Sequence, residues 1–392
     1  MADSSLQRIS YIKESEPGTV PEDEFQALRF TGGSFPHSTD TTRSEEVRPD
    51  GQRGQMVRTN VTAAPSINIE FSAQTFDDLI EGVMRSEWSD GVNKEGDDVK
   101  VTSSGDGKRG KIESDTLDFS DVTPRQWVHV SGLDTADANG WYKVIEASSN
   151  SLTVEPVTAT DDNSAGKTVK IVGSYIRNGT QTHSFAFQRD FGDLGEDYVE
   201  LIPGCRANQL DLSIDDGEIV TGSISFEGLK KELREGLAGN GKVNDAPGTE
   251  IFNAVDHVKA IMADVEGEMA PIGVDVTSAS IALDQNARRQ GAIGVLGAAG
   301  ISHGSLDATG SLTLYLTGDS WDYLQRYLDF KKFGLALVFD DGTHGYVIEF
   351  PRIALTDEPG NVPGPDDDVM LEFDFGAEPG EDYDRVVQII KR

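Results

Sequence analysis

The chain has 392 residues, enough for two or three domains that each bury a core. Its 68 Asp and Glu against 34 Lys and Arg give a net charge of −34, which argues against binding nucleic acid by phosphate neutralisation and against anionic membrane surfaces. Cys205 is the single cysteine, and neither a membrane-spanning apolar run nor an apolar signal near MADSSLQRIS is present, so we expect a soluble chain without an intrachain disulfide or a secretion signal.

The N-terminal third predicts an extended segment, a strand and a long loop. Residues 1–24 lack periodicity and contain two prolines, so we expect an arm or an extended segment. Residues 26–33 predict a strand. Residues 34–60 are polar, with a strand edge expected at Thr41–Val47. A polar stretch of this length is typical of a long hairpin or of a loop that contacts a partner.

A strand that leads into a helix follows, with the sequence INIEFSAQTFDDLIEGV over residues 67–83. Ile67, Ile69 and Phe71 alternate with polar residues and predict one apolar face of a strand. Thr75 stands where a helix N-cap is expected, and the apolar residues after it have helical spacing, which predicts a helix over about residues 75–85.

Residues 97–173 differ in character from the rest of the chain. They contain five short alternating runs: VKVTS, WVHVSG, WYKVIEA, SLTVEPV and KTVKIVG. Asn139-Gly140, between two of these runs, predicts a tight turn. We therefore expect a small β-barrel inserted into a larger domain, and we expect deletion of residues 97–172 to leave assembly intact.

The chain then returns to longer strands. HSFAFQ at 183–188 predicts a strand, and the segment around Asp216-Gly217 predicts a hairpin over residues 210–228. Residues 229–255 join this part to the next, and their KKELREG is expected to add a helical turn.

The strand–helix unit occurs a second time. Residues 312–328 read LTLYLTGDSWDYLQRYL and match residues 67–83 at a constant offset of 245, with Ser320 at the expected N-cap. Tyr198-Val199 matches Tyr346-Val347 at an offset of 148, and the hairpin matches residues 353–376. Residues 285–305 take the place of the 34–60 loop. These matches indicate two copies of one β-rich domain.

We therefore divide the chain into six parts, as follows: an N-terminal arm (1–24), a discontinuous first copy (25–96 and 173–228), an inserted β-barrel (97–172), a linker (229–256), a second copy (257–377) and a C-terminal strand or arm (378–392). The expected fold class is mainly β, with a β-sandwich and one short flanking helix in each copy.

No group of residues predicts catalysis, a cofactor or a metal site, so we expect a protein that is not an enzyme. The histidines are scattered and none has a partner at metal-ligand spacing. Asp366-Asp367-Asp368 fits a solvated turn or a divalent cation site. Trp127, Trp141 and Tyr142 fit either the core of the inserted barrel or a face that binds sugar or peptide.

Acidic residues concentrate near the C-terminus, where residues 357–384 hold eleven carboxylates and no Lys or Arg. Within this segment Glu372 and Asp374 alternate with apolar residues, and Glu70 and Asp211 have the same position on their strands. One face of these strands is therefore expected to be core and the other to be negative. That negative face is either a solvated sheet surface or the inner wall of a channel.

Together these features resemble the tail tube proteins of long-tailed (siphovirus-type) phages. The residues that carry the resemblance are ESEPGTVPEDEFQALRFTGGSF, TTRSEEVRPDGQRG, INIEFSAQTFDDLIEGVMRSEW, HSFAFQRDF, DLSIDDGEIVTGSISFEG, GSLTLYLTGDSWDYLQRYLDF and LALVFDDGTHGYVIEFPRI. They cover most of the chain outside the insert. Most members of this family supply one domain per chain, and six domains close a ring, so two domains per chain imply a trimeric ring with pseudo-sixfold symmetry.

The resemblance also implies partners and places. The chain is expected to assemble with itself into stacked rings and to contact the tape measure, tail terminator and distal tail proteins. It is expected to conduct double-stranded DNA without specific binding, to reside in the virion after assembly in the host cytoplasm, and to contact no membrane. Because the chains repel one another, we expect salt or divalent cations to promote stacking.

The resemblance assigns two sets of residues. The candidates for the lumen wall are Glu70, Asp211, Glu372 and Asp374. The candidates for ring stacking are Arg43, Glu45, Glu46, Arg48, Arg53, Arg288 and Arg289. Two other classes stay open: an adhesion or receptor-binding protein that uses the insert as its binding module, and a hydrolase on a β-scaffold with a pair of carboxylates in a cleft.

Overall fold

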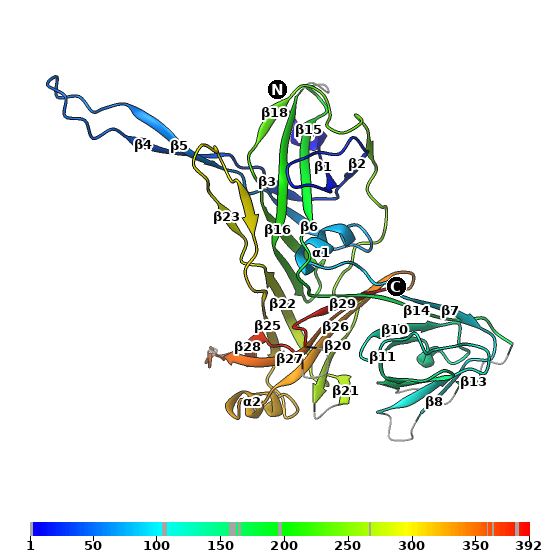
Figure 1. Cartoon of the computed structure of the whole chain (residues 1–392). Coiled ribbons are helices and arrows are strands. Elements are labelled where there is room, and N and C mark those ends of the chain that lie inside the picture. Colours follow the sequence, from blue (N-terminus) through cyan, green and yellow to red (C-terminus); the bar gives the residue numbers. More distant parts are fainter. Residues whose placement is uncertain are drawn as a thin grey trace.

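The computed structural model describes residues 3–103, 108–156, 162–163, 166–194, 198–265, 268–358, 360–362, 364–380 and 384–392 (Figure 1). Within these residues the chain is mainly β, with large sheets and two short α-helices, as the sequence predicts. Buried apolar side chains from both halves of the chain form one large core, and the insert has a core of its own.

The first sandwich has two layers joined by one long strand, β16 (Val199–Asp215). The first half of β16 pairs with β15 (Ser184–Phe191), and the second half pairs with β17 (Thr221–Glu227). The two layers are completed by four strands: β1 (Gln7–Glu14) and β2 (Phe25–Ala27) beside β15, and β6 (Ser66–Glu70) and β3 (Gly32–Ser34) beside β17.

Two predictions for the N-terminal part differ from the structure. Residues 7–14 are not a free arm, because β1 pairs with β15 along its whole length and buries Ile9 and Tyr11 in the core. Residues 26–33 do not form one strand. They divide into β2 and β3, which pair in different layers, so the chain crosses between the layers at residues 28–31.

The two helices lie where the sequence predicts them. α1 (Asp77–Met84) follows β6, and α2 (Trp321–Leu328) follows β25 (Asp307–Tyr315). The predicted N-cap Thr75 is wrong, because the N-cap position is Phe76 and the Thr75 hydroxyl lies 2.9 Å from Ser72 Oγ instead. Ser320 holds the N-cap position of α2, but its Oγ accepts from the Thr317 N–H, 2.7 Å away, and does not cap the helix.

The second half of the chain repeats the pairing of the first. The order β20–β26–β27–β28–β25–β22 corresponds to β1–β15–β16–β17–β6–β3. The strands are β20 (Val258–Val265), β22 (Val276–Asp284), β26 (Phe333–Asp340), β27 (Gly345–Asp357) and β28 (Met370–Ala377), with β21 (Glu268–Pro271) paired to β20. Even the irregularities agree: the register of β16 shifts at 207/209, and that of β27 at 355/357, again 148 residues later.

A short strand follows each hairpin. β18 (Glu232–Arg234) pairs with β16, and β29 (Gln388–Lys391) pairs with β27. The helical turn predicted for KKELREG is therefore wrong, because residues 232–234 form a strand that pairs with the edge of β16. β19 (Val243–Asn244) pairs in parallel with β2.

The insert lies beside the second half of the chain (Figure 1) and is joined to it by strand pairing, because residues 174–177 pair antiparallel with β29. Its strands are β7 (Val92–Gly96), β8 (Lys100–Ser103), β9 (Gly110–Glu113), β10 (Trp127–Ser131), β11 (Gly140–Ala147), β12 (Ser151–Glu155), β13 (Asp162–Asn163) and β14 (Val169–Arg177), in the order β7–β14–β10–β11–β12–β9–β8–β13. Pairing begins at residue 92, before the predicted boundary of 97. Asn139-Gly140 is not a two-residue turn, because residues 132–139 separate β10 from β11 and the Asn139 side chain bonds back to Leu133.

Two hairpins leave the body of the molecule. The longer one joins β4 (Ser38–Arg43) to β5 (Met56–Thr62), and the shorter joins β23 (Arg288–Gln290) to β24 (Gly300–Ser302). They interrupt corresponding places, the first between β3 and β6 and the second between β22 and β25. The expected strand at Thr41–Val47 begins and ends earlier, at residues 38 and 43.

Candidate functional site: a shared sheet, two hairpins and the docked insert

One sheet runs through both halves of the chain. The second half of β16 pairs antiparallel with β22, from Gln209 opposite Asp284 to Asp215 opposite Ser278. Because β22 then pairs with β25, and β25 with β28, six strand segments form a continuous sheet in the order β6–β17–β16–β22–β25–β28. The pairing between β16 and β22 is the seam between the two halves.

The two faces of this sheet differ sharply in polarity. One face is buried throughout and carries residues such as Ile67, Leu212, Ile281, Leu312 and Phe373. The opposite face, which we call the polar face, carries mostly hydroxyl, amide and carboxylate side chains that are half-buried or exposed. Alternation along each strand produces this division, because successive side chains point to opposite faces.

The polar face brings together all four residues predicted for the lumen wall. Glu70, Asp211, Glu372 and Asp374 lie on it in register, as the ladders of β6, β17, β16, β22, β25 and β28 show. Three more carboxylates, which were not among the predicted residues, lie on the same face: Asp215, Asp284 and Asp307. The alternation of Ser278, Ser280 and Asp284 with apolar residues in β22 is the signal that could have found them.

The polar face carries no compensating cation. Residues 66–70, 209–215, 221–225, 278–284, 307–313 and 370–376 contain no Lys or Arg. Hydrogen bonds between neighbouring strands satisfy part of the face: Ser223 Oγ donates to Asp211 Oδ2 over 3.1 Å, and the Ser280 and Ser311 hydroxyls lie 2.7 Å apart. Glu372 and Asp374 stay exposed to solvent. Such a surface repels polyanions and offers no group that would retain them.

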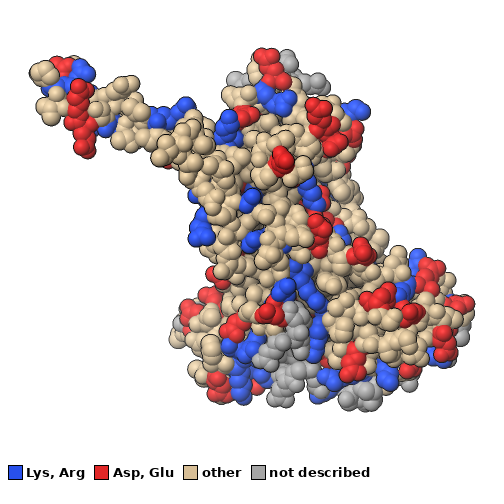
Figure 2. Space-filling view, viewed as in Figure 1, with Lys and Arg blue, Asp and Glu red and all other residues tan. Residues whose placement is uncertain are grey.

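The hairpin of β4 and β5 reaches far from the body of the molecule (Figure 1). It carries five of the predicted stacking residues, all of them exposed: Arg43, Glu45, Glu46, Arg48 and Arg53. Arg48 pairs with Asp50 over 2.6 Å at the tip, where Figure 2 shows charges of both signs gathered. Exposed Val47, Met56 and Val57 accompany these charges. Within the described residues nothing else in the chain covers this hairpin, so the hairpin is free to contact another molecule.

The two remaining stacking candidates behave differently from each other. Arg288 is exposed on the hairpin of β23 and β24. The Arg289 guanidinium instead donates to the carbonyl oxygens of Gly228 (2.8 Å) and Leu229 (3.0 Å) and lies near Glu227. Arg289 therefore fastens the base of this hairpin to β17. Beyond it, Ile293 and Val295 are exposed at the tip.

The tryptophans of the insert face the second half of the chain. Trp127 and Trp141 pack with Ala336, Val338 and Val347. The prediction that they form either the barrel core or an open binding face is therefore wrong for both; Tyr142, by contrast, belongs to the core of the insert. The indole N–H groups need acceptors when buried, and two carboxylates of the second half supply them.

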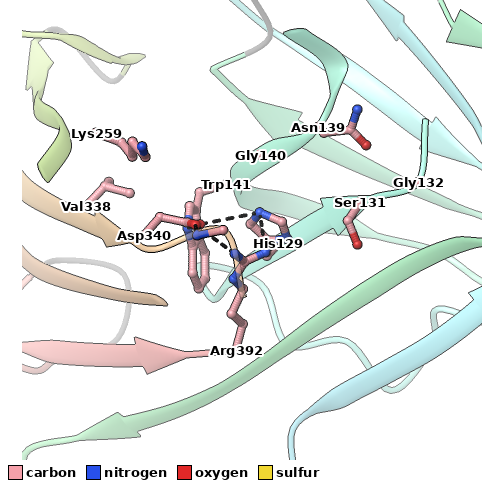
Figure 3. Close-up of a pocket in the computed structure, with 11 residues that line it drawn as sticks. His129, Ser131, Gly132, Asn139, Gly140, Trp141, Lys259, Val338, Asp340 and Arg392 are labelled. Carbon is pink, nitrogen blue, oxygen red and sulfur yellow. Dashed lines mark hydrogen bonds and ion pairs between the residues drawn. The ribbon is translucent and has the colours of Figure 1, made fainter. Parts of the chain in front are cut away.

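Those carboxylates each collect several donors. Glu349 accepts from Trp127 Nε1 over 2.9 Å and from Gln388 Nε2, and it pairs with Lys143 Nζ over 2.8 Å. Asp340 accepts from Trp141 Nε1 over 2.8 Å and from Arg392 Nη2 over 2.7 Å (Figure 3). The insert is thus held by a buried, charged and hydrogen-bonded interface.

A cavity of about 580 Å³ opens beside this interface, lined by His129, Trp141, Lys259, Asp340 and Arg392 among others (Figure 3). Arg392 Nη1 lies 2.9 Å from the His129 ring nitrogens. Burial and the positive charge of Arg392 lower the pKa of His129 to about 4, although Asp340 opposes them. His129 is therefore neutral at pH 7.

No arrangement that suggests metal binding occurs among the residues that the structure describes. Asp366-Asp367-Asp368 lies in an exposed turn between β27 and β28. Neither described helix is long and apolar enough to cross a bilayer.

A comparison with known protein families finds a match over most of the chain. The model of a family described as "Phage tail tube protein" matches residues 4–377. No curated protein matches the chain.

Proposed function

Because that match covers nearly the whole chain, the chain belongs to the phage tail tube protein family and is a structural component of the virion tail, and from this premise we propose how it builds a tube. Three chains, each with two tandem tail-tube domains, close a ring with pseudo-sixfold symmetry. The rings stack into the tail tube of a siphovirus-type phage. The polar face lines the lumen, through which DNA leaves during ejection.

The observation that carries this proposal is the continuous sheet across the two halves of the chain. Each half contributes four strands in the same order, β3–β6–β17–β16 and then β22–β25–β28–β27. Among the described residues, β3 and the end of β27 each pair with a strand on one edge only, and exposed edges are sites where strands of other chains add. Three such eight-stranded sheets, joined edge to edge, make a closed barrel without any open edge.

The charge of the polar face suits a DNA conduit. Duplex DNA carries one phosphate charge per about 1.7 Å of its axis, and a wall with Lys or Arg would bind it. The seven carboxylates named above, from Glu70 to Asp374, would repel the duplex and keep it centred. Screening limits this effect to about 8 Å at physiological salt, so the wall would act on DNA that comes close to it.

The hairpins suit contacts between rings. The hairpin of β4 and β5 extends beyond the body and combines exposed apolar residues with charges of both signs, as partner-contacting surfaces do. We assign stacking to this hairpin and to Arg288, and we expect the tube to contact the tape measure, tail terminator and distal tail proteins. Assembly would take place in the host cytoplasm.

Electron microscopy of the purified full chain tests the proposal. We expect rings or tubes with a central hole, with sixfold features in projection and growth that increases with NaCl. Particles without a hole, or scattering that falls as NaCl rises, would contradict it. The adhesion alternative loses its binding module, since Trp127 and Trp141 are buried against the second half of the chain.

A further inference from the structure

The two halves of the chain carry equivalent surfaces, of which one pair is buried in the internal seam and the other pair is uncovered. Constant offsets relate equivalent positions: 245 residues from β6 and α1 to β25 and α2, and 148 residues from β16 to β27. Within the chain, the α1 side of the first half meets the β22 and β27 side of the second half. The α2 side of the second half does not contact the first half within the described residues. Neither does the side of the first half that carries β3, β18 and the start of β16 contact the second half there.

The internal seam has a tyrosine at its centre. Tyr346 donates its hydroxyl to an Asp77 carboxylate oxygen and accepts from the Gln74 N–H over 2.8 Å. Its ring packs 5.4 Å from the ring of Phe71, between centroids, and Phe339 also contacts Phe71. Burial and Asp77 raise the pKa of Tyr346 well above its usual range. The tyrosine is therefore a fixed donor in the seam.

On the α2 side, the counterparts of buried seam residues are exposed. Phe71 and Phe76 are fully buried, whereas their counterparts Leu316 and Trp321 are exposed, Trp321 to 58%. Leu328, the counterpart of buried Val83, is 69% exposed. Exposing these apolar residues of the α2 surface to water costs free energy. The equivalent α1 surface is covered by the other half of the chain, so a surface of that kind would also fit over α2.

On the β16 side the same contrast appears. Tyr198, the counterpart of Tyr346, is 58% exposed. Leu233 occupies on β18 the place that buried Ile389 has on β29, since it pairs with Glu200 as Ile389 pairs with Ile348, and it is 80% exposed. Together with Phe191 and Leu194, these residues line an open cavity of about 420 Å³.

The polar partner of the tyrosine is also repeated. Asp322 is the counterpart of Asp77 at the 245-residue offset. The supporting cation differs, because Asp77 pairs with Lys391 over 2.7 Å whereas Asp322 pairs with Arg326 of its own helix over 2.8 Å. Asp322 is thus paired with a cation of its own helix, and a carboxylate in one such pair has further lone pairs for another donor.

We infer that the chain-to-chain seam of the ring repeats the internal seam, so that the Tyr198 hydroxyl of one chain donates to Asp322 of the next chain. Leu316 and Trp321 of that next chain fill the cavity beside Tyr198 and Leu233. The end of β27 pairs with the β3 edge in the register of β16 with β22. The inference rests on the proposed ring and adds its partner surface and register.

The register gives a direct test. Gln209 lies opposite Asp284 in the internal seam. The counterpart of Gln209 at the 148-residue offset is Asp357. The counterpart of Asp284 is Ser38, because Ser38 pairs with Thr62 as Asp284 pairs with Asp307, and Thr62 and Asp307 are related by the 245-residue offset. Opposed antiparallel residues have Cβ atoms about 4.5–5.5 Å apart, close enough for a disulfide after a small adjustment. The natural Cys205 is buried, so we expect it to form no cross-link between chains that could be confused with the engineered one.

The experiment oxidises assembled Ser38→Cys/Asp357→Cys chains and resolves them on a denaturing, non-reducing gel. We expect covalent dimers and trimers and nothing larger, since three chains close the ring. Gln209→Cys/Asp284→Cys is the matched positive control and should give an internally linked monomer, and each single variant should give no ladder. Tubes that form without cross-linking would overturn the seam and leave the proposed tube standing, whereas wild-type chains without rings or tubes would overturn the proposed function itself.

A second measurement decides the matter if the double cysteine variant does not assemble. Trp321→Asp and Leu233→Asp should each slow tube growth at least tenfold, with the thermal unfolding of the free chain unchanged. Ala136→Asp, at an exposed position of the insert, is the matched control and should grow at the wild-type rate. Growth of the Trp321→Asp and Leu233→Asp chains at the wild-type rate would overturn the inference.

Discussion

The indole Nε1 of Trp127 donates a 2.9 Å hydrogen bond to Oε2 of Glu349, and both side chains are fully buried although they lie 222 residues apart. The bond joins the insert to the second half of the chain. A buried carboxylate needs such donors and an ion-pair partner, because removing an isolated charge from water is costly. The insert is therefore bound to the second sandwich through buried polar contacts and is not an independent appendage.

Removing the Glu349 carboxylate should destabilise the chain strongly. Glu349→Ala removes the carboxylate that pairs with the buried ammonium of Lys143, and breaking a buried pair costs about 3–5 kcal/mol. Urea unfolding of the unassembled chain measures this loss. Glu372→Ala, at an exposed carboxylate, should stay within about 0.5 kcal/mol of wild type. The double variant Glu349→Leu/Lys143→Met should recover most of the loss, and a Glu349→Ala chain of wild-type stability would contradict the account.

Deletion of residues 97–172 should destabilise the chain, contrary to the expectation from sequence that this deletion leaves assembly intact. It removes both tryptophans and uncovers Ala336, Val338 and Val347. We expect a lower unfolding temperature and aggregation, measured by differential scanning fluorimetry with light scattering. Deletion of residues 44–55 from the exposed hairpin is the comparison and should leave the unfolding temperature unchanged. An equal unfolding temperature in the two deletion variants would refute this prediction.

Acid should weaken the interface of the insert through His129. The folded pKa of about 4 lies below the ordinary value of 6.5, so the unfolded chain binds the proton first as pH falls. The contribution of His129 is complete above pH 6.5 and is lost between pH 6.5 and 4, by at most about 3 kcal/mol. Asp340, Arg392 and Lys259 face the same cavity as His129.

His129→Gln tests this dependence, because glutamine keeps a polar side chain without a titrating group. The difference in unfolding free energy between pH 7 and pH 4.5 should be smaller in this variant than in wild type. His37→Gln, at an exposed site, should behave as wild type. Equal pH dependence of wild type and His129→Gln would count against the interpretation.

Reversing charge on the polar face should make the tube retain DNA. Glu372→Lys/Asp374→Lys places two new ammonium charges of each chain on the proposed lumen wall. We therefore expect DNA binding that weakens steeply as the salt concentration rises. A filter-binding assay with short duplexes at several NaCl concentrations measures it. Asp137→Lys/Glu146→Lys makes the same change on the exposed surface of the insert and should bind less DNA. Equal binding by both variants would argue against a lumen at the polar face.

The two neighbouring arginines of the shorter hairpin should separate stability from stacking. Arg289→Ala removes hydrogen bonds to two carbonyl oxygens and should cost about 1–3 kcal/mol in the free chain. Arg288→Ala, at an exposed site, should leave that stability unchanged and slow tube elongation. Denaturant unfolding and time-resolved scattering measure the two effects. Slowed elongation only in Arg289→Ala would contradict the stacking role of Arg288.

Much of the fold could be predicted because its signals are local. Alternation over 67–71 gave β6, helical spacing gave α1 and α2, and the offsets of 245 and 148 residues predicted a repeat that the pairings of both halves reproduce. The β1 strand was not predicted, although Ile9 and Tyr11 alternate with polar residues, because what fixes it is pairing with β15, far away in the sequence. The Thr75 cap failed because a serine three residues earlier competes for its hydroxyl.

By itself, the sequence determined the β-rich repeat, the acidic strand faces and the long exposed hairpin, because periodicity and charge depend on residues that are close together in the sequence. Only the tertiary structure decided that β16 and β22 fuse the two halves into one sheet, that Trp127 and Trp141 bind carboxylates of the second half, and that Arg289 serves its own chain. Strand pairing and buried ion pairs join residues far apart in sequence, and each candidate strand offers nearly the same backbone hydrogen bonds to every partner. Shape and burial in three dimensions select among those partners.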